Sequence, residues 1–427
     1  MGRVVFCLLI VFTATSFKIV DRDHKSSSAG TGLLKSIEKA RKMLEPESVQ
    51  LLKGTVGTKR VRVGRRRYQE VPVTGIIGRE MALAIMDSEG ETRIARAIKR
   101  DEAMEVLTPG FILSVRRDNG VNSDIAVVLP AGGKVLAVKY PISNEGNRFG
   151  PGGEVIEAIY TPYSAEIKTD EVIERGIEIQ TDLINKAYAR LSERAVYSRA
   201  FPGRKVVDVV PQDVLTVLLM NEHIDPGLFK SAGLARPLVE QVLAIIATNG
   251  HKAYAYSISS AGARGLVQMI PSTYRLIAGR YPAARLEPNF LVGMNDPVNA
   301  IIAQILLCDS DWESIKTQSE ISADRIGPYL AAAYNGGVGR VLSALRNDEQ
   351  EWMESPDLSR RPTKTVTVKV PVRTRTRRGR SRVTYVLKSY TQPIFMSETS
   401  KYVSQYHWIN DFFVARGTGG FKPLKED

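Results

Sequence analysis

The sequence predicts an α+β chain in which a β-rich accessory region precedes a mainly helical region. Three observations predict this class. Short β-prone runs separated by turn signals fill residues 60–163, and apolar residues recur at helical spacing from about 166 onward. The helical part is interrupted once, at 360–392, by an alternating segment rich in Lys and Arg. We therefore expect one domain at 60–163 and a second at 164–427 that carries an inserted basic β-hairpin.

The N-terminus has the pattern of a secretory signal peptide. Residues 1–16 combine an early basic residue, a run of nine apolar residues and small residues where a signal peptidase cuts. Nine apolar residues are too few to span a bilayer, although an uncleaved anchor that runs on to Val20 is an alternative. Residues 17–59 are expected to form a linker and a helix at 33–52. We expect an exported protein of the periplasm or cell envelope.

Turn signals organise the β-rich region. The sequence DSEGE at 87–91 separates two β-prone runs, and RRDNG at 116–120 separates two more. A DNG turn between two such runs is typical of a β-hairpin.

Helical periodicity dominates the rest of the chain. Residues from about 166 to 191 place apolar side chains on one broad face. Further helices are expected at about 212–222, 236–248, 271–280, 296–308, 327–345 and 398–413.

The interruption at 360–392 alternates polar and apolar residues around a turn at Arg378-Gly379, which predicts a hairpin. Eleven Lys and Arg residues lie between Arg360 and Lys388. Such a ribbon is either a solvated edge that resists aggregation or a flap that binds anions. The second interpretation gives segment 360–388 an anionic envelope polymer or a membrane surface as partner.

Glu222 is the candidate general acid. It ends the apolar helix predicted at 212–222 and shares a face with Leu215 and Leu218. Apolar surroundings and the negative end of the helix both disfavour a charged carboxylate, so both raise its pKa. A general acid near neutral pH needs that shift. The alternative is an exposed glutamate at a frayed helix end.

The segment SISSAGARGLVQMIPSTY at 257–274 predicts a wall of a substrate cleft. Gly262 and Gly265 permit tight turns, and Pro271 suits a helix start. The amide of Gln268, just before that helix, can donate and accept as an N-acetyl group requires, or it can tie down the turn. Tyr334 and Asn335 supply two more polar groups before a glycine break, where Tyr334 is alternatively a helix anchor.

These elements together resemble the lytic transglycosylase domain of murein-degrading enzymes, which is related to goose-type lysozyme. The family pattern is a glutamate at a helix end, a serine, GAxGLxQxxPxT, a D-P-x-x-N helix, AAYNxG and an E-T-x-x-Y-V helix. The resemblance covers roughly residues 210–415. The matching residues, in order, are Glu222, Ser259, Gly262-Ala263, Gly265-Leu266, Gln268, Pro271, Thr273, Asp296-Pro297, Asn299, Ala332 to Asn335, Glu398-Thr399 and Tyr402-Val403.

Three departures accompany the resemblance. His223 stands where the family usually has serine after the glutamate, and Asn299 is one residue short of the family spacing. Ser259 lies 37 residues after Glu222, much farther than usual, which a helix inserted around 236–248 would explain. Glu240, in the middle of that helix, is the competing acid, and a lost active site with Asn249 or Gly250 at the position of the acid is the other alternative.

The resemblance implies a lysozyme-like fold and a peptidoglycan lytic transglycosylase. Glu222 would first protonate the β-1,4 glycosidic oxygen between N-acetylmuramic acid and N-acetylglucosamine. It would then deprotonate the muramic C6 hydroxyl, leaving a 1,6-anhydro end. The substrate-binding residues implied are Ser259, Gln268, Met269, Tyr334, Asn335 and Tyr402.

Two other functions stay open at this point. A goose-type muramidase would use water as the acceptor and a second carboxylate, of which Asp225 is the nearest in sequence. A non-catalytic peptidoglycan-binding envelope protein would keep the cleft without the reaction.

Composition restricts partners and cofactors. The 427-residue chain carries a formal net charge of +13, which favours anionic partners. Nucleic acid is not expected, because a secretion signal is present and the basic runs lack interleaved aromatic residues. The four histidines and two cysteines show no metal-ligand spacing, so we expect no metal and no cofactor.

Overall fold

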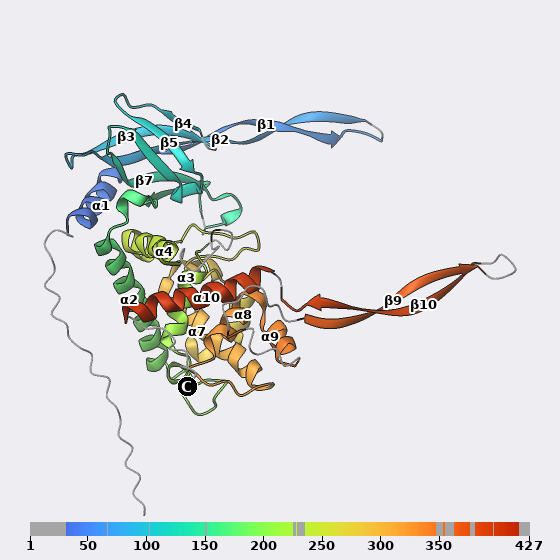
Figure 1. Ribbon diagram of the computed structural model, residues 1–427. Coiled ribbons are helices and arrows are strands. Elements are labelled where there is room, and N and C mark those ends of the chain that lie inside the picture. Colours follow the sequence, from blue (N-terminus) through green and yellow to red (C-terminus); the bar gives the residue numbers. More distant parts are fainter. Residues whose placement is uncertain are drawn as a thin grey trace, which may run out of the picture.

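The computed structural model describes residues 31–65, 67–101, 103–149, 152–224, 228, 235–346, 353–354, 363–375, 381–395 and 397–417. The signal-like segment 1–16, Asp225 and the hairpin turn at Arg378-Gly379 lie outside these residues. Within them the chain is α+β, with a β-rich N-terminal part and a helical C-terminal part, as the sequence predicts (Figure 1).

The N-terminal helix is shorter than expected. Helix α1 covers Thr31–Leu44 rather than 33–52, and strand β1 begins at Gln50. Pro46 explains the early end, because a proline disfavours helical geometry in the residue before it and lacks the N–H that a continuing helix needs. β-structure therefore starts ten residues before residue 60, where the sequence suggested it.

A six-stranded antiparallel sheet forms the β-rich part. Its main path runs β4-β3-β2-β7-β8, and β1 pairs with β2. The strands are β1 Gln50–Arg62, β2 Tyr68–Met86, β3 Thr92–Arg100, β4 Ala103–Val106, β7 Lys134–Ser143 and β8 Val155–Tyr160. The DSEGE turn joins β2 to β3, as predicted. Helix α1 packs against β7 and buries Ile37, Ala40 and Leu44 on Leu136 and its neighbours.

The DNG signal also marks a hairpin, as predicted. Strands β5 (Ile112–Arg117) and β6 (Asp124–Leu129) form a separate antiparallel pair. The connection is longer than a two-residue turn, because a short 3₁₀ helix at Gly120–Asn122 is inserted in it.

Helices build the rest of the described chain (Figure 1). Most bounds agree with the sequence prediction, and the helix expected at 327–345 is broken at Gly337, which has a positive φ of 85°. The helices are α2 Asp170–Glu193, α3 Gln212–Asn221, α4 Ala235–Asn249, α5 Pro271–Arg280, α6 Phe290–Asn295, α7 Pro297–Lys316, α8 Gly327–Gly336, α9 Val338–Leu345 and α10 Ser397–Arg416.

One hydrophobic core runs from the sheet into the helices. The same cluster of buried residues includes Leu83 and Val138 of the sheet and Leu183, Leu243 and Ile301 of the helical part. Polar contacts cross the same boundary. The Arg41 guanidinium of α1 donates to the Thr248 carbonyl at 2.7 Å, and the Asn249 side chain exchanges hydrogen bonds with the backbone N–H and C=O of Thr161. The β-rich part is therefore packed against the helices through a shared core.

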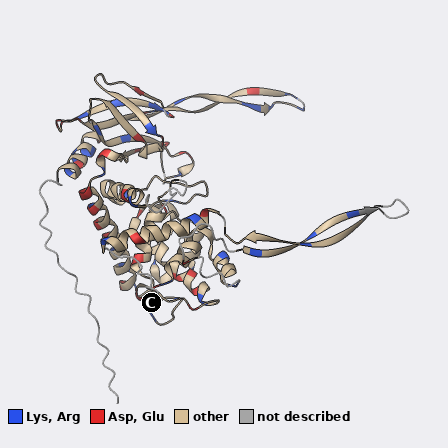
Figure 2. Cartoon of the chain, in the orientation of Figure 1, with Lys and Arg blue, Asp and Glu red and all other residues tan. Residues whose placement is uncertain are grey.

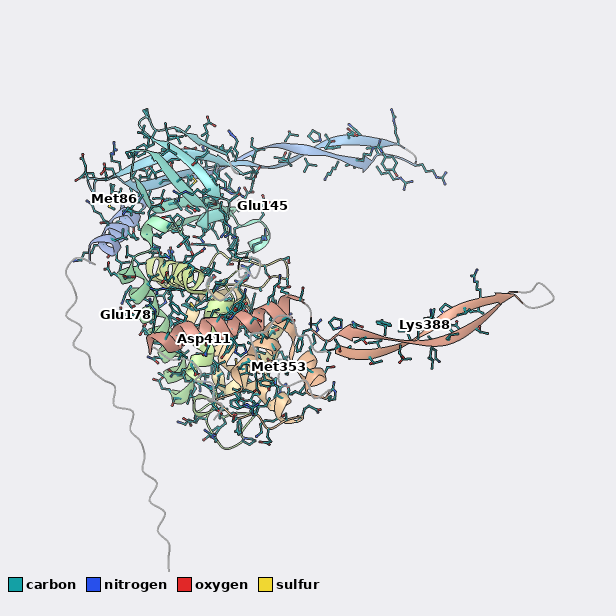
Figure 3. All side chains as sticks on the ribbon, viewed as in Figure 1. Met86, Glu145, Glu178, Met353, Lys388 and Asp411 are labelled. Atoms are coloured by element: carbon teal, nitrogen blue, oxygen red, sulfur yellow. The ribbon has the colours of Figure 1, made fainter. Side chains whose placement is uncertain are left out.

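Two long ribbons project on the same side of the molecule (Figure 1). One is the outer part of β1–β2. The other is the predicted basic hairpin, β9 (Thr363–Arg375) paired with β10 (Ser381–Pro393). Lys and Arg residues occur along both ribbons (Figure 2), and Lys388 lies well away from the helical body (Figure 3). In the part of the chain that the structure describes, none of the helices has the length and apolar character needed to span a membrane.

Candidate active site

Glu222 ends helix α3 where the sequence places it. The backbone N–H of this residue still bonds to the Leu218 carbonyl, and α3 buries both Leu215 and Leu218 completely. The Tyr402 hydroxyl of α10 donates a hydrogen bond of 2.5 Å to Glu222 Oε1. A carboxyl is thus held at the junction of two helices that lie 180 residues apart in sequence.

The surroundings of Glu222 favour its neutral form. Burial raises its pKa, the hydrogen bond from Tyr402 opposes that rise, and the negative charge of Glu398 adds to it; the resulting pKa is about 8. Burial in a low-dielectric site penalises the charged carboxylate, which is the effect that the apolar helix predicts. At neutral pH Glu222 is therefore mainly protonated and able to donate a proton.

His223 packs beside the acid and is also neutral. Its ring stacks on Tyr254, with ring centroids 3.5 Å apart and planes 10° from parallel, and its Nε2 lies 2.8 Å from the Leu266 carbonyl oxygen. Burial lowers the pKa of His223 to about 4, against the effect of that hydrogen bond. A neutral imidazole that faces a carbonyl through Nε2 must carry its proton there, so Nδ1 is left as an acceptor.

The loop at 257–269 turns sharply at the two predicted glycines. Gly262 has φ 81° and Gly265 has φ 67°. A Cβ atom on Gly265 would lie 2.6 Å from the Met294 carbonyl oxygen, so a residue without a side chain is needed where these two backbone segments approach each other. Helix α5 then begins at Pro271.

Gln268 ties down the turn and also lies in the wall of a pocket. Its Nε2 donates to the Gly265 carbonyl at 2.8 Å. Ser259 acts similarly, because its Oγ accepts the Ala263 N–H at 3.0 Å in the same loop. The Tyr334 hydroxyl donates to the Val267 carbonyl, so Tyr334 anchors the loop to α8.

Asn335 is oriented by a residue from the last helix. The Thr399 hydroxyl donates to Asn335 Oδ1 at 2.7 Å. Since that bond occupies the amide oxygen, the NH₂ group of Asn335 is left as a donor. The family pattern includes this threonine, but sequence reasoning assigned it no role.

Six of the seven predicted site residues line one pocket of about 360 Å³, which we call the Ser259 pocket. They are Glu222, Ser259, Gln268, Met269, Tyr334 and Asn335. Met269 is almost fully buried, whereas Ser259 is exposed at the pocket's edge. The seventh, Tyr402, contacts the site through its hydrogen bond to Glu222.

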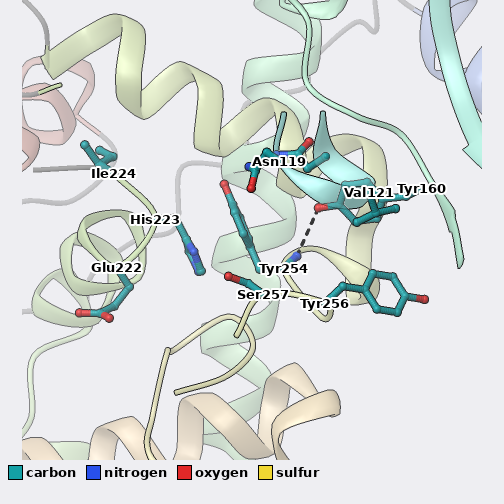
Figure 4. A pocket seen from close by; sticks show the side chains of 10 residues that line it. Asn119, Val121, Tyr160, Glu222, His223, Ile224, Tyr254, Tyr256 and Ser257 are labelled. Atoms are coloured by element: carbon teal, nitrogen blue, oxygen red, sulfur yellow. Dashed lines mark hydrogen bonds between the residues drawn. The ribbon is translucent and has the colours of Figure 1, made fainter. Parts of the chain in front are cut away.

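Glu222 also lines a second pocket, of about 380 Å³, which we call the Asn119 pocket (Figure 4). Its walls come from the β5–β6 loop, from β8, from the end of α3 and from the segment after α4. The lining residues are Asn119, Val121, Asn122, Tyr160, Glu222, His223, Ile224, Tyr254, Tyr256 and Ser257. Sequence reasoning singled out only Glu222 and, as the first residue of the predicted cleft wall, Ser257; it gave the others no role in binding. The DNG turn was the one sequence signal near this pocket. It predicts a hairpin, but it does not indicate which distant segments pack against that hairpin.

The competing acid lies outside these pockets. Helix α4 forms where an inserted helix was predicted, and Glu240 on it forms ion pairs with Lys168 and Arg236 at 2.9 and 2.8 Å. Burial alone would raise the pKa of Glu240, but the hydrogen bonds and charges of these two partners outweigh it and lower the pKa. Asn249 is engaged with Thr161, as described above, rather than with a pocket.

Of the described residues that line the two pockets, Glu222 alone carries a carboxylate. Among the residues that the structure describes, no cluster of His, Cys, Asp or Glu is arranged to hold a metal ion. The described residues of the two pockets therefore offer one carboxyl group that could act as a general acid, among neutral amides, hydroxyls and aromatic rings.

Comparison with known proteins identifies part of the helical region. Neither the curated proteins nor the solved structures yielded a match. Residues 227–354 match the transglycosylase SLT domain family. This range contains Ser259, Gln268, Met269, Tyr334 and Asn335, whereas Glu222 lies five residues before it and Tyr402 lies 48 residues after it. The chain thus carries a lytic transglycosylase-like domain, with a peptidoglycan-acting function of that type.

Proposed function

We propose that the protein cleaves the β-1,4 bond between N-acetylmuramic acid and N-acetylglucosamine, with Glu222 as the single acid and base and a 1,6-anhydro-muramic end as product. The observation that carries this proposal is the position of the Glu222 carboxyl, held by Tyr402 at the end of α3. The carboxyl has a pKa of about 8 and lines the same pocket as Ser259, Gln268 and Asn335. A general acid must hold its proton at the working pH, and amide and hydroxyl groups suit acetamido sugars.

The reaction needs one carboxyl in two states. Glu222 first gives its proton to the glycosidic oxygen, the bond from that oxygen to the muramic C1 breaks, and the acetamide of the same sugar stabilises C1. The resulting carboxylate then takes the proton of the muramic C6 hydroxyl, whose oxygen bonds to C1. Glu222 regains its proton, and no water is consumed. The hydrogen bond from Tyr402 stabilises the carboxylate between the two steps.

A hydrolytic muramidase is less well supported, because it would use a second carboxylate to place the water. Glu222 is the sole carboxylate among the described residues of the two pockets, and Asp225 lies outside the described residues. The two reactions differ in their products, since hydrolysis leaves reducing muramic ends and transglycosylation leaves anhydro ends.

The test is digestion of purified peptidoglycan, with the released fragments identified by mass spectrometry. The wild-type protein should release anhydro-muramic fragments. Glu222→Gln should lower the rate by about 10²- to 10⁴-fold, the usual contribution of a general acid. Glu240→Gln is the matched control, because it makes the same change at the competing acid and should keep most of the activity.

Three outcomes contradict parts of this proposal. Unchanged lysis by Glu222→Gln would remove Glu222 as the acid. Reducing ends in place of anhydro ends would favour the muramidase. Peptidoglycan binding without lysis by the wild type would favour the non-catalytic binding protein.

The basic hairpin supplies a second contact in this proposal. Residues Lys364, Lys369 and Lys388 are exposed on the β9–β10 ribbon, away from the pockets. Peptidoglycan carries muramyl and peptide carboxylates, and associated envelope polymers or membrane surfaces are often anionic. We assign the ribbon to such an anionic surface, which would hold the enzyme near its substrate. The same proposal places the protein in the periplasm or cell envelope.

A further inference from the structure

The Asn119 pocket draws part of its wall from the β-rich region. Residues 119–122 connect β5 to β6 and face the His223–Tyr254 stack of the helical part (Figure 4). This loop is held at both ends. The Asn119 N–H donates to Ser123 Oγ at 3.0 Å, and Asn122 Oδ1 accepts the Tyr163 N–H at 2.8 Å. The loop is therefore a built part of the pocket wall.

The polar groups of this pocket are neutral donors and acceptors. Because Asn122 uses its oxygen to hold Tyr163, its NH₂ group is left as a donor. The Nδ1 of His223 is an acceptor, and Asn119 and Ser257 add an amide and a hydroxyl to the lining. Aromatic rings complete the wall. This combination is typical of sites that bind the hydroxyls, the acetamide and the apolar face of a pyranose ring.

The charge of the pocket selects between the two sugars of peptidoglycan. At neutral pH the described lining residues carry no charge, since Glu222 and His223 are both neutral. Arg117 lines a smaller neighbouring cavity of about 80 Å³ instead. A lactyl or peptide carboxylate would find no cation among the described lining residues to offset its desolvation, so muramic acid is disfavoured. N-acetylglucosamine carries no carboxylate, and in the alternating polymer it flanks every muramic acid residue.

We propose that the Asn119 pocket binds the N-acetylglucosamine residue adjacent to the reacting muramic acid, so that the β5–β6 loop forms part of the glycan site. This inference rests on the proposed function, because it takes the Ser259 pocket and Glu222 as the place of reaction. It assigns the β-rich region a direct role in binding the substrate.

The test is calorimetric titration with tetra-N-acetylchitotetraose, an oligomer of N-acetylglucosamine alone. All proteins carry Glu222→Gln, so that bound sugar is not cleaved. Asn119→Trp places a large side chain at the mouth of the pocket and should weaken binding at least tenfold. Asn119→Ala removes one amide and should weaken it by less, about threefold. Ser88→Trp is the matched control, because Ser88 is exposed in the DSEGE turn outside both pockets, and it should bind like its parent.

Thermal unfolding of each variant shows whether it is folded. Parental affinity in both Asn119 variants overturns the inference, and so does the absence of chitotetraose binding in their folded parent. Turnover is measured separately on peptidoglycan. If peptidoglycan digestion yields anhydro products but the Asn119 variants bind chitotetraose like their parent, this inference is overturned and the proposed reaction stands. Asn119-dependent binding without any anhydro product overturns the proposed reaction and leaves a saccharide site.

Discussion

The chemistry proposed here depends on the protonation state of one residue, Glu222. Its pKa of about 8 lies above the ordinary 4.5 because burial outweighs the hydrogen bond from Tyr402. The unfolded chain therefore loses this proton first, and Glu222 destabilises the fold increasingly as pH rises from about 4.5 to 8. Since the neutral form is the proton donor, activity should fall as pH rises through about 8. The site gains a proton donor at a cost in stability.

Sequence reasoning identified this acid but not its neighbour. A helix that ends at a glutamate after buried leucines predicts a raised pKa, because the apolar environment is local in sequence. His223 gave no such signal. Its neutral state comes from burial, to which the stacked Tyr254 ring contributes, and the segments that bury it are brought close only by the fold.

The loop at 257–269 makes the most specific prediction at the scale of an element. Gly265→Ala would force a Cβ atom against the Met294 carbonyl at a positive φ, so it should destabilise the protein by about 2–4 kcal/mol. It should also weaken chitotetraose binding, because Gln268 hydrogen-bonds to the Gly265 carbonyl. Denaturant unfolding and calorimetry measure the two effects.

Gly279→Ala is the matched control for this substitution. Gly279 is exposed in α5, and a Cβ atom added there would have open space around it, with nothing within 4 Å. The change should stabilise the protein by roughly 0.5–1 kcal/mol through helix propensity. Equal stability of the two variants would contradict the tight-turn account of the loop.

Elements set by local patterns were predictable, and those set by distant contacts were not. The start of α5 at Pro271 and the break at Gly337 follow from proline and glycine geometry. The predicted end of α1 at residue 52 was wrong. The apolar residues that follow Pro46 continue the helical pattern in the sequence, but in the structure they lead into strand β1. The Asn119 pocket depends on how the β-rich region packs against α4, which no periodicity reports.

At the scale of the whole molecule, the projecting basic ribbon should control adhesion rather than chemistry. Neutralising three of its lysines should weaken binding to isolated cell walls several-fold at low salt, and the difference should shrink as salt screens the charges. Cleavage of short soluble glycan fragments should change little, because the ribbon lies away from the pockets. The substitutions are Lys364→Gln, Lys369→Gln and Lys388→Gln.

The control removes the same charge from another surface. Lys35, Lys39 and Lys42 are exposed on α1, and their replacement by glutamine changes the net charge equally. Co-sedimentation with cell walls compares the two triple variants. Equal losses in both would show that net charge acts, and that the ribbon has no special role.

The most direct test of the central claim is the titration of the Glu222 carboxyl, followed by carbon-13 NMR of the protein labelled at glutamate side chains. The resonance that is absent from Glu222→Gln identifies the residue. The account predicts a midpoint near pH 8 in the free enzyme. A midpoint near 4.5, the value of an ordinary glutamate, would contradict it, because the carboxyl would then be ionised at neutral pH and could not act as the proton donor.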